Sequence, residues 1–136
     1  MKRRKIIISI LLSCVVVAIA LRSTARVDGG FATSAIIKYH YMDSDIEIAV
    51  TDEADLAALK SLLSGFPRRD SPSCGFSADI SITLTDGNNE LVFCPACDGD
   101  PVIRIGEGDR YMEISDEARS DLDVVVGKYG MTFPCL

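Results

Sequence analysis

The amino-acid sequence predicts an α+β domain in which a mostly antiparallel sheet carries two helices on one face, in the order ββαββββα, preceded by an N-terminal apolar helix. Three observations predict this class. Apolar and polar residues alternate in several short runs, two longer segments repeat apolar residues at helical spacing, and turn-forming residues separate these runs. Hairpins with helices between and after them are typical of a two-layer α+β sandwich.

The chain begins with a basic cluster followed by an apolar run, an order that is typical of an export signal. Residues 2–5 are all Lys or Arg, and residues 6–21 carry no charge. This run is longer than the roughly 15 residues of a usual signal peptide and shorter than the roughly 20 that span a bilayer. We therefore expect residues 1–26 to be a signal peptide or, in preference, an N-terminal membrane anchor. The rest of the chain is then extracytoplasmic at the cell membrane, or secreted if the segment is cleaved.

The residues after this segment lead into the first predicted hairpin. Residues 27–34 are small, polar and without periodicity, and are predicted as a linker ahead of a domain at 35–136. Apolar and polar side chains then alternate over residues 37–41 and again over 46–50, on either side of an Asp-Ser-Asp turn. This alternation predicts a β-hairpin.

Two segments have the spacing of amphipathic helices. The first lies between the capping candidates Thr51 and Asp52 and the terminator Gly65. Its apolar face is formed by Leu56, Leu59, Leu62 and Leu63. The second begins after the capping candidate Ser115 and ends at Gly130. Its apolar face is formed by Ala118, Leu122, Val125 and Tyr129.

Four further strands are predicted between the two helices, as two hairpins. They cover residues 80–84, 91–93, 103–105 and 111–114. A pairing of Thr85 with Glu90 sets the register of the first of these hairpins. This register places the large apolar residues on one face, as the pairs Leu84 with Leu91 and Ile82 with Phe93.

Acidic side chains dominate the chain after the apolar segment. The whole chain has 14 Lys and Arg against 20 Asp and Glu, with six of the basic residues before Val27. From Val27 onward the net charge is therefore 8 − 20 = −12. Such a surface repels phosphate backbones and anionic headgroups, so we expect no nucleic-acid partner. A cationic partner or ion is accommodated more easily.

Four cysteines after the apolar segment are the main chemical signal: Cys74, Cys94, Cys97 and Cys135. An even number in an oxidising compartment predicts two disulfides, whose pairing the sequence leaves open. Cys94 and Cys97 also have the Cys-x-x-Cys spacing of thiol oxidoreductases, but the acidic residues that follow would raise the thiol pKa. A thiolate metal site is a third alternative, although a second closely spaced ligand pair is missing.

No catalytic residue, metal ligand or cofactor is assigned. His40, the only histidine, alternates with tyrosines and is expected on the exposed face of a strand. We interpret the protein as a non-enzymatic extracytoplasmic binding module, stabilised by disulfides and tethered to the membrane through its N-terminal segment. Its partner would be an unknown protein or small ligand. The alternatives are thiol-disulfide exchange through Cys94 and Cys97, and thiolate metal binding.

Overall fold

The computed structural model describes residues 25–41, 43–69, 72–73 and 75–132, together with residues 8, 10 and 13. The order of elements is β1 (Val27–Asp28), η1 (Gly29–Phe31), β2 (Ser34–Tyr41), β3 (Ser44–Val50), α2 (Glu53–Leu62), β4 (Ser64–Gly65), β5 (Ile80–Thr85), β6 (Glu90–Pro95), β7 (Val102–Ile105), β8 (Tyr111–Glu113) and α3 (Asp116–Lys128). The predicted α+β class, with a mostly antiparallel sheet and two helices, is confirmed. The apolar helix predicted ahead of the domain lies outside the described residues, apart from those three positions.

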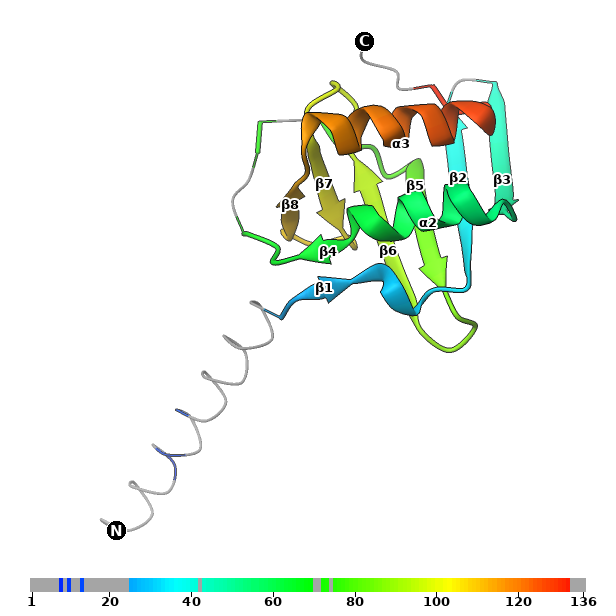
Figure 1. Cartoon of the computed structure of the whole chain (residues 1–136). Helices are drawn as coiled ribbons and strands as arrows, with labels where there is room; N and C mark the ends of the chain where they lie inside the picture. The colour runs from blue at the N-terminus through cyan, green and yellow to red at the C-terminus, as the bar shows by residue number, and fades with distance from the viewer. Residues whose placement is uncertain are drawn as a thin grey trace.

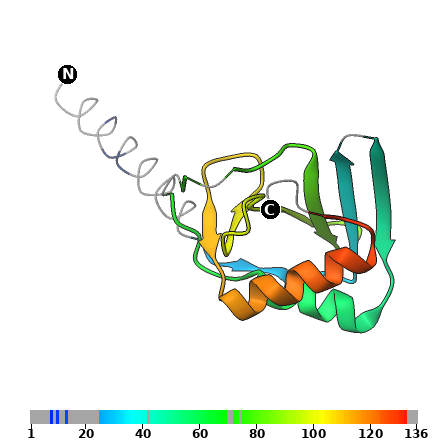
Figure 2. The ribbon, with the colours of Figure 1, turned by 90° about the horizontal axis from the view of Figure 1, so that it is seen from above.

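The main sheet has six strands in the order β3-β2-β5-β6-β7-β8, and every neighbouring pair is antiparallel. Figure 1 shows α2 and α3 in front of this sheet, with β3 and β8 at its two edges, and Figure 2 shows both helices on the same side. The register predicted for the hairpin of β5 and β6 is confirmed. Its pairs include Thr85 with Glu90, Leu84 with Leu91 and Ile82 with Phe93.

The core lies between the sheet and the two helices. Alternation along the strands places one set of side chains toward the helices, and these are the residues that are almost fully buried. The largest buried side chains, from the strands and from the two helices with their ends, are Phe93, Ile37, Leu59, Leu63, Ile80, Ile82, Leu84, Ile103 and Leu122. The helical faces predicted from the leucine spacing in α2 and from the apolar spacing in α3 thus pack against the sheet.

Both helices begin at the side-chain caps that the sequence predicts. The Asp52 carboxylate accepts hydrogen bonds from the backbone N–H groups of residues 54 and 55 at the start of α2. The Ser115 hydroxyl accepts one from Ala118 N at the start of α3. Helix α2 ends earlier than predicted, at Leu62, because Ser64 and Gly65 leave the helix and pair with β1 as a short strand.

The residues that enter the domain pack against it. Residues 27–34, predicted as a linker, carry β1, η1 and the first residue of β2, and the Val27 side chain is buried. Gly29 N donates a hydrogen bond to Leu63 O (2.6 Å). A Cβ atom on Gly29 would lie 2.8 Å from the Leu84 side chain, so only glycine fits this close approach.

The expectation of a transmembrane helix needs correction. Within the part of the chain that the structure describes, no helix is long and apolar enough to cross a membrane. The two longest described helices, α2 and α3, have 10 and 13 residues and bury only one face each. The apolar run at residues 6–21, which suggested a span, lies outside the described residues except at positions 8, 10 and 13.

Candidate functional site

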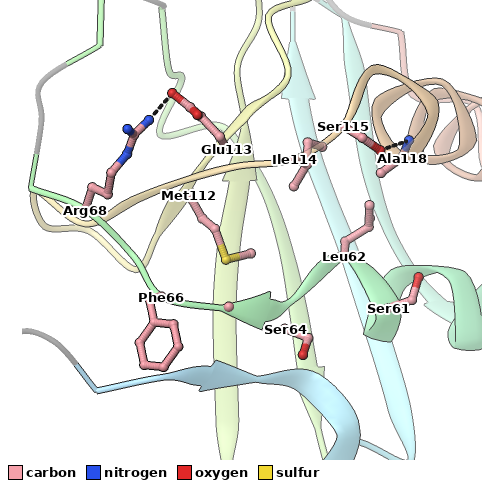
Figure 3. A pocket seen from close by; sticks show the side chains of 11 residues that line it. Ser61, Leu62, Ser64, Phe66, Arg68, Met112, Glu113, Ile114, Ser115 and Ala118 are labelled. Atoms are coloured by element: carbon pink, nitrogen blue, oxygen red, sulfur yellow. Dashed lines mark hydrogen bonds and ion pairs between the residues drawn. The ribbon is translucent and has the colours of Figure 1, made fainter.

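A pocket of about 470 Å³ opens between β4 and the segment that joins β8 to α3 (Figure 3). One wall is formed by the end of α2, β4 and the residues that follow it, through Arg68. The other is formed by Met112, Glu113 and the first residues of α3. The pocket exists because α2 ends at Leu62 and the chain turns into β4 instead of continuing toward α3.

Apolar side chains form the floor of this pocket. Figure 3 shows Leu62, Met112 and Ile114 directed into the space between its two walls. Leu62 and Met112 are each 6% exposed, so they also belong to the core beneath the pocket. A Cβ atom on Gly65 would lie 3.0 Å from Met112 Sδ. The absence of a side chain at Gly65 therefore lets the methionine reach under β4.

An exposed aromatic side chain lies at the rim. Phe66 is 69% exposed, the highest value among the large apolar residues of the folded domain. The proline that follows it restricts the Phe66 backbone to extended conformations. Two residues further on, Arg68 N and O both bond to the backbone of Tyr111, at 2.6 and 2.8 Å. Phe66 thus projects from a short segment that is fixed on both sides.

Polar groups surround the apolar floor, and each has a partner in the structure. Arg68 and Glu113 form an ion pair, with both side chains more than half exposed. The Ser64 hydroxyl accepts a hydrogen bond from Arg26, and the Ser61 hydroxyl donates one to a backbone carbonyl of α2. Among the residues that the structure describes, Arg68 and Glu113 are the only ionisable side chains that line the pocket, and no Cys or His does so. The arrangement therefore suits binding of an apolar group with a polar surround.

The Cys94 thiol lies elsewhere, on the sheet face opposite the helices. Cys94 pairs with Arg104 at the end of β6 and is 2% exposed. Its Sγ donates a hydrogen bond to Ser77 O (3.2 Å). Burial raises the pKa of this thiol to about 11, and the nearby Arg104 charge only partly opposes that rise. The thiol is protonated at neutral pH, which is the opposite of what a redox nucleophile needs.

Arg119 of α3 holds the turn at residues 96–100, which contains Cys97. This guanidinium is almost fully buried, and its Nη1 donates hydrogen bonds to Ala96 O (2.9 Å) and Asp100 O (2.8 Å). On the other side of the turn, Cys97 N donates to Gly75 O (2.8 Å). The sequence interpretation missed Arg119, although it precedes Leu122 by one helical turn and shares its buried face.

The disulfide prediction is also corrected. No disulfide forms among the residues that the structure describes, where Cys94 and Cys97 are both buried. Cys74 and Cys135 lie outside those residues. No group of three or more His, Cys, Asp or Glu side chains in the described ranges could hold a metal ion. His40, the remaining candidate ligand, is exposed on β2 and pairs with Asp45.

A buried carboxylate between the two helices was not predicted. Asp55 is 5% exposed and accepts hydrogen bonds from Lys128 Nζ and from the Tyr129 hydroxyl (3.1 Å). The hydrogen bond from Lys128 lowers the pKa of Asp55, whereas burial acts in the opposite direction. Asp55 precedes Leu59 by four residues, so helical spacing already placed it on the inner face of α2.

The pocket at β4 is therefore the candidate site, and Cys94 and Cys97 belong to the packed interior. Comparison of the chain with protein-family models, with curated proteins and with solved structures found no match.

Proposed function

We propose that this domain is a non-enzymatic binding module that receives an apolar side chain of a protein or peptide partner in the pocket between β4 and α3. The observation that carries this proposal is Phe66, 69% exposed on a fixed segment beside an apolar floor. Aromatic side chains that stand exposed next to a concave surface are typical anchors of protein interfaces.

The dimensions and chemistry of the pocket support a side chain as its occupant. Its volume of about 470 Å³ falls within the range of ligand pockets. Burial of one large aliphatic or aromatic side chain contributes roughly 1.5–3 kcal/mol. The exposed ion pair of Arg68 and Glu113 offers hydrogen bonds to the backbone beside such an anchor. The net charge of −12 from Val27 onward favours a partner with basic residues around the anchor.

The N-terminal sequence supports an extracytoplasmic location for this module. A basic cluster followed by an uncharged apolar run at residues 2–21 is the order of export signals. The proposal therefore places the binding event outside the cytoplasm.

The test is a titration of the full chain, labelled with ¹³C at the methionine methyl groups, with N-acetyl-phenylalaninamide or N-acetyl-leucinamide. We expect the methyl resonance of Met112 to shift in a saturable manner, because this side chain lies on the pocket floor. Ala118→Leu fills the pocket from α3, and Phe66→Ala removes the rim. We expect the first change to abolish the shift and the second to weaken binding several-fold.

Val124→Ala is the matched control, because Val124 is 61% exposed on α3 and does not line the pocket. It should bind like the unmodified chain. If Met112 does not respond to either compound, or if Ala118→Leu binds as well as Val124→Ala, the pocket is not the binding site and the proposal fails.

A further inference from the structure

Strand β3 forms a long open edge of the main sheet. Seven residue pairs join its inner side to β2, and no strand among the described residues pairs with its outer side. The opposite edge is different, because Arg68 bridges to Tyr111 of β8 there. An open edge presents a row of backbone N–H and C=O groups to which another strand can bond.

The hydrogen-bond alternation shows which residues of β3 present these groups. His40 N donates to Asp79 O, on the β5 side of β2, so His40 and its partner Asp45 form a pair without mutual backbone bonds. In an antiparallel ladder, bonded and non-bonded pairs alternate. The backbone groups of Asp45, Glu47 and Ala49 therefore point outward, away from β2.

The side chains along this edge alternate in character. Asp45 and Glu47 lie on the sheet face away from the helices, where Asp45 contacts His40 and Glu47 forms an ion pair with Lys38. Their side chains remain 83% and 58% exposed, so both can accept further hydrogen bonds. Ile48 lies on the helix side of the sheet and is 37% exposed. A strand added here would meet two carboxylates, followed by Ala49, on one face and the Ile48 side chain on the other.

We infer that β3 is a docking edge for an extended segment of a partner protein in which Lys or Arg alternates with apolar residues. The segment binds antiparallel to β3, the orientation found in every neighbouring strand pair of this sheet. Its basic side chains lie beside Asp45 and Glu47, and its apolar side chains continue the surface of Ile48. Backbone hydrogen bonds to β3 supply affinity for any extended segment, and the alternating side chains supply specificity for this one.

A second copy of this chain does not fit the same edge. Antiparallel pairing of two β3 strands would bring Asp45 and Glu47 close to the same carboxylates of the other copy. Directly opposed like charges destabilise strand pairing, and each copy carries a net charge of −12 from Val27 onward. The chemistry of the edge thus selects a basic partner.

The first experiment is calorimetric titration of the full chain with the acetylated peptide Lys-Val-Lys-Val-Lys-Val-Lys. We expect binding that weakens as salt is added, because the charge pairs are exposed. The double variant Asp45→Lys/Glu47→Lys should lose at least tenfold in affinity and gain affinity for the peptide in which Glu replaces every Lys. The matched control is Asp109→Lys/Asp121→Lys, which makes the same change of net charge at exposed positions away from β3.

A second measurement separates strand addition from plain charge attraction. In an antiparallel pair, the lysines opposite Asp45 and Glu47 exchange backbone bonds with them, and the valines do not. N-methylation of the lysine amides should abolish binding. N-methylation of the valine amides should change the affinity by no more than about threefold, because the valine N–H groups point away from β3.

Several outcomes would overturn the inference. Equal effects of the two methylation patterns, or equal losses in the edge variant and its control, would show that the peptide binds only by charge. No binding of the unmodified peptide would show that Asp45 and Glu47 serve only to prevent edge pairing. Phe66→Ala leaves the edge intact and should bind this peptide normally, so failure of the pocket proposal and failure of the edge proposal are distinguishable.

Discussion

Replacement of Arg119 tests how α3 supports the turn at residues 96–100, which contains Cys97. Arg119→Met keeps an apolar stem and removes the guanidinium. Ala96 is 0% exposed, so its carbonyl would lose a charged donor without access to water, which costs roughly 1.5–3 kcal/mol. Asp100 is exposed, and water would replace much of the second bond, at a cost of about 0.5–1 kcal/mol. We expect a total loss of about 2–4 kcal/mol.

The assay is urea unfolding followed by far-UV circular dichroism. With an m-value of about 1.5 kcal/mol/M for a domain of this size, the midpoint should fall by about 1–3 M. Hydrogen exchange of the Cys97 amide, which bonds to Gly75 O, should be faster in the variant in urea well below the midpoint, because the turn opens locally.

The control is Asp123→Ala, which removes the 44% exposed carboxylate that accepts a hydrogen bond from Arg119 Nε. Only the Asp123 side of this pair is exposed, because the Arg119 side chain is 5% exposed. Arg119 keeps both carbonyl bonds in this variant, so we expect it to unfold at a higher urea concentration than Arg119→Met. If Arg119→Met costs no more than Asp123→Ala and leaves Cys97 equally protected, the two carbonyl bonds do not stabilise the turn and the reasoning is refuted.

Two further predictions follow from the shifted pKa values. The pKa of Asp55 is lowered in the folded state by Lys128, so its contribution to stability is present above the unfolded pKa near 4 and is lost as pH falls through the folded value. Asp55→Asn should therefore be less stable at pH 6 and should lose less stability on acidification, measured by urea unfolding from pH 6 to pH 2; parallel curves would contradict this. Cys94, with a pKa of about 11, should be alkylated slowly at pH 8, and its rate should rise about tenfold per pH unit up to that value. A rate that is already maximal at pH 8, followed by peptide mass spectrometry, would show that the thiolate is accessible after all.

The main sheet and both helices could be predicted because each follows from a local pattern. Alternation and the turn after Thr85 set the register of β5 and β6, and that register is confirmed. Asp52 and Ser115 cap their helices because a side-chain oxygen three residues before a backbone N–H satisfies it. The partners in these interactions lie close together in the sequence, so a single segment contains both of them.

The site depends on contacts that no single segment contains. The pocket arises from β4, which forms only because residues far earlier in the chain, in β1, pair with it. Phe66 reads as a loop residue in the sequence, and only the bridge between Arg68 and Tyr111 reveals that its segment is fixed. Asp55 and Arg119 were missed because charged residues are usually exposed, whereas here each is almost fully buried with specific partners.

The short sheet of β1 and β4 has a mechanical consequence. The chain enters the domain through β1, whose two residues pair with β4, and β4 is also a wall of the pocket. Tension applied from the N-terminal side would therefore load β4 before it reaches the six-stranded sheet. A pull strong enough to separate Val27 from Gly65 would therefore displace one wall of the pocket.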